Sequence, residues 1–206
     1  MSKTLFGMIQ ALQETISSQE AFLTELDGAI GDADHGINMN RGFEAVITKF
    51  TEEDTDIGAT LKKLGMTLLS TVGGASGPLY GTAFMRAGAE AQGKETLTLE
   101  EAEVMLAAAI KGIQDRGKAV KGEKTMLDAM MPAHDALKQA IADGLSVVEG
   151  LEKACAAANE GIEFTKTIRA TKGRASYLGD RSIGHQDPGA TSFTLMLETA
   201  TKYLKA

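Results

Sequence analysis

The sequence predicts an all-α fold over residues 1–206 as one domain, and three observations support this prediction. The chain has no Trp and only 5% aromatic residues, whereas Ala, Leu and Met are abundant, a composition that favours helices over strands. Apolar residues recur at spacings of three and four along most of the chain. No segment reads as a convincing strand, and no repeat or long linker divides the chain.

The first four helices are predicted from this apolar periodicity. A break between the first two is expected near Ser17 and Ser18. The third helix carries one apolar face, made of Phe43, Val46, Ile47 and Phe50, and the fourth repeats Leu61, Leu64 and Leu68. These helices are expected over residues 3–17, 19–26, 36–50 and 57–70.

Several of the later helices are predicted from their start signals. Pro78 suits a first helical turn, so Ser76 or Gly77 is the expected N-cap. Thr98 and Glu101 fit a capping box, and an Asp-Pro-Gly run opens the last helix. The expected ranges are 78–91, 98–116, 124–143, 147–167 and 187–205, with a candidate kink at Pro132.

Three carboxylates lie within eight residues in the stretch Asp27-Gly-Ala-Ile-Gly-Asp32-Ala-Asp34-His-Gly36. Asp and Gly are poor helix residues, so the stretch is expected to be a loop. Asp32 and Asp34 point the same way in an extended segment, and the glycines let Asp27 approach them. Carboxylates this close repel each other unless a cation lies between them, and oxygen ligands favour Mg²⁺ or Ca²⁺.

The spacing of these residues argues against an EF-hand calcium loop. Such a loop beginning at Asp32 requires Gly in its sixth position and Glu in its twelfth, where this chain has Ile37 and Phe43. Mg²⁺ is usually bound by a few carboxylates together with water and substrate phosphates. The stretch therefore indicates a metal–phosphate site, and the alternative is a solvated acidic turn with an Asp helix cap.

A glycine-rich stretch over residues 71–82 ends in a predicted helix start. Unpaired backbone N–H groups and the helix dipole at such a junction bind phosphate, although glycines also occur in plain helix–helix turns. Together with the acidic stretch it indicates a nucleotide site. The familiar nucleotide motifs are absent from the sequence: the P-loop, the Rossmann glycine fingerprint and the protein-kinase signatures.

Residues 170–186 lack a helical pattern and carry Lys172, Arg174 and Arg181 in a chain of net charge −7. Long loops in compact domains are often functional, and cationic side chains bind phosphate. We expect this segment to form a lid over phosphates, with Arg174 as the candidate catalytic residue because a guanidinium offers a bidentate fork. For Lys172 alone we expect a merely solvated side chain.

The remaining composition excludes several classes of protein. The negative net charge argues against a nucleic-acid partner. The single Cys155 rules out a disulfide framework and is expected in the core, and His134 and His185, without clear partners, are expected to be structural. Neither a signal peptide nor a run of about 20 apolar residues is recognisable, so we expect a cytoplasmic protein with no membrane partner.

Four motifs occur in order along the chain: Gly31-Asp-Ala-Asp-His-Gly36, Gly73-Gly-Ala-Ser-Gly-Pro78, Gly122-Glu-Lys-Thr-Met-Leu-Asp128, and the stretch from Gly173-Arg-Ala-Ser-Tyr177 to Asp187-Pro-Gly189. Together they resemble the L subunit of dihydroxyacetone kinase, the nucleotide-binding subunit of the phosphotransferase-system-dependent enzyme. The resemblance covers essentially the whole chain. It implies a closed antiparallel barrel of about eight helices that binds nucleotide at one end.

The resemblance also implies ligands and site residues. Asp27, Asp32 and Asp34 would bind two Mg²⁺ ions that bridge the phosphates of ADP or ATP. His35 is interpreted as a neutral nucleotide contact, in preference to a phosphorylated residue, because it lies within the carboxylate stretch. The residues implied to contact the nucleotide are His35, Gly36, Ile37, Asn38, Ser76, Gly77, Gly117, Met126, Arg174, Asp187, Pro188 and Gly189.

In the family that the chain resembles, ADP stays bound as a cofactor. A phosphohistidine on the M subunit phosphorylates it, and the γ-phosphoryl group passes to dihydroxyacetone on the K subunit. This chemistry needs charge neutralisation and alignment more than a protein base, and no base is obvious in this chain. Two alternatives remain: the nucleotide domain of a dihydroxyacetone kinase that uses free ATP, which the length of 206 residues weakens, and a nucleotide-loaded module that binds a transcription regulator.

Overall fold

The computed structural model describes residues 4–206, and across that range the chain forms nine α-helices and one 3₁₀ helix with no strand. The expected start of the first helix at Lys3 lies outside the described residues. The elements are α1 (Leu5–Ser18), α2 (Glu20–Ile30), α3 (His35–Ile47), α4 (Ile57–Thr71), α5 (Ser76–Glu90), α6 (Leu99–Gly117), α7 (Leu127–Ala142), α8 (Val147–Thr167), η1 (Arg174–Ser182) and α9 (Pro188–Lys205).

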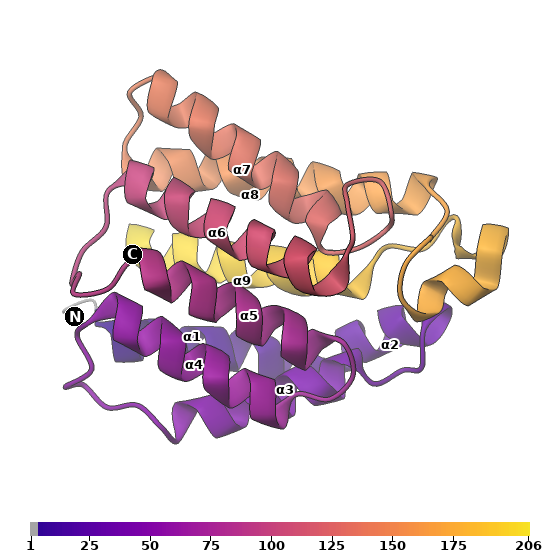
Figure 1. The fold of residues 1–206 in the computed structure, drawn as a ribbon, viewed down its shortest axis with the longest axis horizontal. Coiled ribbons are helices and arrows are strands. Elements are labelled where there is room, and N and C mark those ends of the chain that lie inside the picture. The colour runs from indigo at the N-terminus through magenta and orange to yellow at the C-terminus, as the bar shows by residue number, and fades with distance from the viewer. Residues whose placement is uncertain (1–3) are drawn as a thin grey trace.

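The contacts between helices form a closed ring, and Figure 1 shows this ring from the side. From α3 onward, each α-helix packs against the next one in the sequence, and α9 returns to pack against α1, which also contacts α3. Helix α2 follows α1 directly and packs against the same two neighbours, α3 and α9, so α1 and α2 together occupy one position of the ring. The expected all-α barrel is therefore confirmed, with eight helix positions in the ring of the described chain.

The core divides into two parts that differ in side-chain size. Large side chains such as Phe43, Leu64 and Leu68 fill the part that is formed mainly by the helices from α1 to α7. The part between α6 and α9 contains many alanines, including Ala129, Ala133, Ala154 and Ala158. Small residues let helix backbones approach closely, so α7 and α8 lie side by side in Figure 1.

Helix α7 contains Pro132 and continues through it to Ala142. A proline has no N–H to donate to the carbonyl four residues earlier, which is here the carbonyl of Asp128. Gly161 of α8 packs directly against that carbonyl, and any Cβ at this position would collide with it. The helix starts at Leu127 and not at Lys124 as expected, because Lys124 adopts a left-handed φ of 61° in a turn held by the Asp128 carboxylate.

The acidic stretch is more helical than its composition predicts. Helix α2 continues through Gly28 to Ile30, so Asp27 lies in its last turn and only residues 31–34 form the loop before α3. Leu23 and Ile30 are both buried on the same face of α2. Their burial offsets the cost of roughly 1 kcal/mol for a glycine inside a helix.

Two further expected boundaries are corrected by the structure. Helix α3 ends at Ile47 instead of continuing to Phe50. Residues 170–186 are not an open loop, because 3₁₀ turns occupy Arg174–Ser182 with a break at Gly179, whose φ is 59°. Figure 1 places this 3₁₀ helix, the end of α2 and the turn after α6 at one end of the bundle, opposite both marked termini.

Candidate functional site

A cavity of about 500 Å³ opens at this end of the bundle. Five segments line it: the α2–α3 junction, the turn before α5, the end of α6 with the turn that follows, residues 172–175, and the start of α9. The sequence-predicted residues that line this cavity are Asp27, Asp32, Asp34, His35, Ser76, Gly117, Met126, Arg174, Asp187, Pro188 and Gly189.

Asp27 organises the α2–α3 junction. Its Oδ2 atom accepts the backbone N–H groups of Asp34 at 2.9 Å and of His35 at 3.2 Å. These donors are the orphan N–H groups at the start of α3, which a carboxylate stabilises by hydrogen bonding and by the helix dipole. Ala33 adopts a φ of 58° to bring the chain back over Asp27. The junction is therefore fixed by contacts within the protein itself.

The three carboxylates of the junction can meet at one point. One oxygen of each of Asp27, Asp32 and Asp34 lies within 4.8 Å of the others, with Asp27 buried and Asp32 exposed. Their donor atoms are all oxygens, and both ring nitrogens of the neighbouring His35 contact serine hydroxyls instead. Such an oxygen-only set fits a hard divalent cation such as Mg²⁺.

His35 is the buried centre of a hydrogen-bond chain between three helices. Its Nδ1 lies 3.0 Å from Ser76 Oγ of α5, and its Nε2 lies 2.9 Å from Ser192 Oγ of α9. Ser192 Oγ lies 2.7 Å from the hydroxyl of Tyr80, which also donates to the carbonyl of Gly189 at 3.2 Å. Burial lowers the pKa of His35, although the charges of Asp27 and Asp34 oppose this shift. The ring is therefore held neutral.

The start of α5 faces the same cavity. Ser76 was expected to be an N-cap, but it is the first residue of the helix, and Ala75 precedes it without a capping side chain. The Ser76 hydroxyl contacts His35 instead. The first turn of α5 therefore has N–H groups without a side-chain cap, beside the Gly73–Gly74 turn, which is a suitable environment for an anion.

Asp187 combines a structural and an electrostatic role at the start of α9. Its Oδ2 accepts the N–H of Ala190 at 2.7 Å, which confirms the expected cap. Burial, together with the nearby charges of Asp128 and Asp27, raises the pKa of this carboxyl to about 7, although the Ala190 N–H and Lys124 act in the opposite direction. A cation bound nearby would favour the charged form of this carboxyl.

Arg174 lies across the cavity from α2, at the start of the 3₁₀ helix. Its Nε atom forms an ion pair with Asp32 Oδ2 at 2.9 Å, and 66% of its side chain is exposed. The guanidinium is thus joined to one of the candidate metal ligands. Lys172 also lines the cavity, with an intermediate exposure of its side chain.

Four of the sequence-predicted residues lie outside the cavity lining. Gly36 packs against the Glu20 carbonyl where α3 crosses α2, and Gly77 packs against the Val72 carbonyl. Ile37 points outward with 48% exposure. The fourth, Asn38, is buried beneath the turn before α5, where its Oδ1 accepts from Arg41 Nη2 at 2.6 Å.

Sequence reasoning missed Lys124 and Arg116, which line the cavity. It also assigned no partner to His134, whose Nε2 lies 2.5 Å from Glu103 Oε1 between α6 and α7. Cys155 is half-buried and not in the core, with its Sγ 3.3 Å from Thr201 Oγ1. Lys124 lies within the motif of residues 122–128, but neither its role nor that of Glu103 is visible in the sequence, because their partners are remote in the chain.

Comparisons with known proteins agree with the motifs. Residues 29–202 match the DAK2 domain. The chain is 52% identical over 186 residues, 90% of its length and 89% of the relative's, to the ADP-binding subunit DhaL of the PEP-dependent dihydroxyacetone kinase of Escherichia coli. It is 42% identical to the ADP-binding subunit DhaL of the PTS-dependent enzyme of Lactococcus lactis, over 95% of this chain and 94% of that one.

Solved structures show the same fold. The dihydroxyacetone kinase of C. freundii in complex with AMP-PNP and Mg²⁺ superimposes with a TM-score of 0.71 at 25% identity, and 96% of this chain is covered. This chain spans 33% of that longer protein. Among the described residues no helix is long and apolar enough to cross a membrane. The chain therefore belongs to the DAK2 domain family, as a relative of the kinase subunits that bind ADP in dihydroxyacetone kinase.

Proposed function

We propose that this protein is the ADP-binding subunit of a dihydroxyacetone kinase that depends on the phosphotransferase system. In this function it relays a phosphoryl group from a phosphohistidine on an M subunit, through bound ADP and ATP, to dihydroxyacetone on a K subunit. The relatives that match nearly the full length of the chain support this function, since their names give ADP binding and dependence on PEP or the PTS. The cytoplasm is the corresponding location.

The observation that carries the proposal is the placement of three carboxylates and an uncapped helix start around one cavity. A nucleotide diphosphate with its metal ions needs both kinds of group, because anionic ligands hold the metal and backbone N–H groups hold phosphate oxygens. Two Mg²⁺ ions held by Asp27, Asp32 and Asp34 would neutralise phosphate charge during transfer.

The protein groups around this site have separate roles. His35, neutral and hydrogen-bonded through both nitrogens, orients Ser76 at the start of α5. Neither nitrogen is free, which argues against a phosphorylated His35. Arg174 pairs with Asp32, and cations bound by that carboxylate would leave the guanidinium available to bind phosphate oxygens. Met126, Gly117 and the start of α9 form the remaining wall.

One experiment separates this function from that of a kinase using free ATP. The purified protein is combined with a K subunit and dihydroxyacetone, and product formation is measured with a phosphorylated M subunit or with ATP as the donor. We expect rapid turnover with the phosphorylated M subunit and little with added ATP, because the nucleotide does not exchange during the cycle. Efficient turnover with ATP alone contradicts the relay and favours the free-ATP alternative.

A further inference from the structure

Lys124 is a buried lysine in the turn between α6 and α7, with 1% of its surface exposed. Its backbone adopts a φ of 61°, in the left-handed region that residues other than glycine rarely occupy. The Asp128 carboxylate holds this turn, since it accepts the N–H groups of Gly122 at 2.5 Å and of Thr125 at 2.9 Å. The turn thus directs a charged side chain into the protein at a backbone cost.

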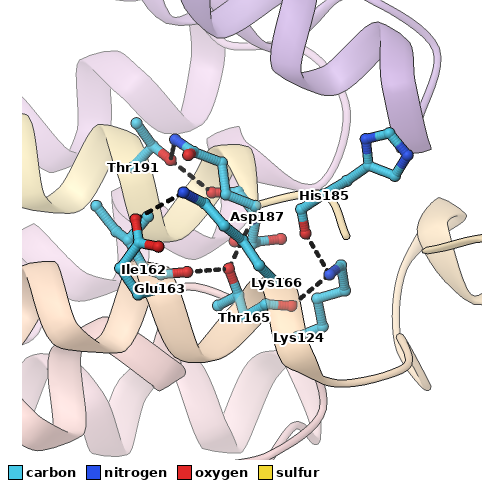
Figure 2. Close-up of polar contacts among 9 residues, drawn as sticks. Lys124, Ile162, Glu163, Thr165, Lys166, His185, Asp187 and Thr191 are labelled. Carbon is cyan, nitrogen blue, oxygen red and sulfur yellow. Dashed lines mark hydrogen bonds and ion pairs between the residues drawn. The ribbon is translucent and has the colours of Figure 1, made fainter. Parts of the chain in front are cut away.

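The ammonium group of Lys124 is satisfied by backbone carbonyls. Figure 2 shows it donating to the carbonyls of Thr165 and His185. A third carbonyl, that of Ile168, lies 3.4 Å from the same nitrogen. An ammonium has three N–H groups, so the three carbonyls account for all of them and leave none for a phosphate oxygen. Lys124 therefore acts through the backbone and not through contact with a ligand.

These three carbonyls flank the 170–186 segment. Thr165 and Ile168 precede it at the end of α8, and His185 lies within its last residues. The two ends are also joined directly, because Gly184 N donates to the Lys166 carbonyl at 2.7 Å. Both ends of the segment therefore meet at the end of α8, with the ammonium between them.

The same junction places the start of α9. The Asp187 N–H donates to Thr165 Oγ1 at 3.0 Å, next to the carbonyl that Lys124 holds (Figure 2). Burial lowers the pKa of Lys124, and the charges of Asp187 and Asp128 act in the opposite direction. The Lys124 side chain thus lies near the acidic groups Asp187 and Asp128 of the cavity wall.

We propose that Lys124 is a positioning residue of the cavity: its buried ammonium fixes both ends of the 170–186 segment and thereby the placement of Arg174 and Asp187. This inference rests on the proposed nucleotide-binding function. It assigns to Lys124 no contact with the nucleotide, and it predicts that removing the charge loosens one segment of the protein selectively.

The test compares Lys124→Met with Lys121→Met, a matched control at an exposed lysine in the same turn. Backbone hydrogen exchange is measured in the nucleotide-free proteins, and the affinity for ADP with Mg²⁺ is measured separately. In Lys124→Met we expect exchange over residues 170–187 to be faster by about tenfold, with α4 unchanged, and ADP binding to be weaker by about tenfold or more. Lys121→Met should behave like the unaltered protein.

Each result decides the proposal. Equal acceleration of exchange in α4 and in residues 170–187, or unchanged exchange and affinity, overturns the positioning role. If Lys124→Met does not fold, Lys124→Gln, which keeps neutral donors, must show the same selective pattern or the proposal fails. If the unaltered protein binds no ADP, the proposed function fails, and the exchange measurement alone then decides the role of Lys124.

Discussion

The two sides of the cavity are built in different ways. On the α2–α3 side, Asp27 is buried and its carboxylate accepts two backbone N–H groups, so the junction is set before any ligand binds. On the opposite side, the 170–186 segment is attached at its ends, and its middle is exposed, as Tyr177 shows with 85% exposure. One side is therefore preorganised, and the other can adjust its position when a ligand binds.

An ion pair joins the two sides. Arg174 and Asp32 form it at 2.9 Å, but both side chains are substantially exposed. Exposed pairs of this kind contribute little to stability, about 0–1 kcal/mol. The pair therefore brings the segment toward the carboxylates without locking it, and a cation that binds Asp32 more strongly would separate them.

The largest expected effect comes from the preorganised side. Asp32→Ala and Asp34→Ala each remove a carboxylate ligand, so we expect nucleotide binding to weaken by more than about a hundredfold. This loss is larger than the loss typical of a residue that only hydrogen-bonds to a metal ligand. The helical circular dichroism should stay largely unchanged, because both residues lie outside helices. Glu25→Ala, at an exposed residue of α2, is the control. Full nucleotide occupancy in both variants would remove the metal role of these aspartates.

The second prediction concerns the pH dependence of the metal-free and nucleotide-free protein. In the folded state the pKa of Asp187 is raised from its ordinary 3.8 to about 7. Between these values the folded state holds a proton that the unfolded state has released, so stability falls as pH rises from about 4 to about 7. From pH 5 to pH 7 we expect the free energy of unfolding to decrease by about 2 kcal/mol from this group.

Urea unfolding in the presence of a chelator measures this effect. Asp187→Asn is the matched variant, because Asn also caps a helix but does not titrate. The variant should lose the decrease that the unaltered protein shows between pH 5 and pH 7. The same pH dependence in both proteins would mean that Asp187 is not the titrating group.

On the adjustable side, Arg174→Lys is expected to weaken nucleotide retention or phosphoryl transfer by about tenfold. A lysine keeps the charge but lacks the planar fork that binds two phosphate oxygens at once. Arg181→Lys, within the same segment, serves as the control for retention and transfer. Lys172→Ala should have a smaller effect than Arg174→Lys, and the reverse order would move the anion-binding role to Lys172.

The smallest expected effect is a change in protease sensitivity. Trypsin should cut at Lys172, Arg174 or Arg181 several-fold faster in the chelated protein than in the protein loaded with nucleotide and Mg²⁺, because ligand contacts order the segment. The 3₁₀ turns and the joined ends limit the difference, since they already restrain the segment without a ligand. Equal rates in the two states would show that the segment is not a lid.

The sequence predicts the helices and the carboxylate side well. The capping signal at Thr98 defines the start of α6 locally, and the range expected for α8 matches Val147–Thr167. The end of α2 is harder to predict, since the helix continues past Gly28 only because Ile30 is buried by tertiary packing. Local propensity does not contain that contribution.

The remaining misses share one physical cause, which is contact between residues remote in sequence. The sequence does not show that Lys124 is buried, because the carbonyls that its ammonium contacts belong to the end of α8. Gly36 and Gly77 lie in motifs of the site, yet they serve close backbone packing beside the cavity and not within its lining. The motifs therefore lie in segments that meet at the cavity, but they do not separate lining residues from supporting ones.

The most direct test of the account is the nucleotide content of the purified protein. The protein is denatured, the supernatant is analysed for nucleotide and magnesium, and chelated protein is tested for rebinding of added ADP with Mg²⁺. The account predicts about one adenine nucleotide per chain, together with Mg²⁺, and a lower melting temperature after chelation, because the ligand stabilises only the folded state. Absence of released nucleotide, together with no binding of added ADP and Mg²⁺, would contradict the assignment of the site.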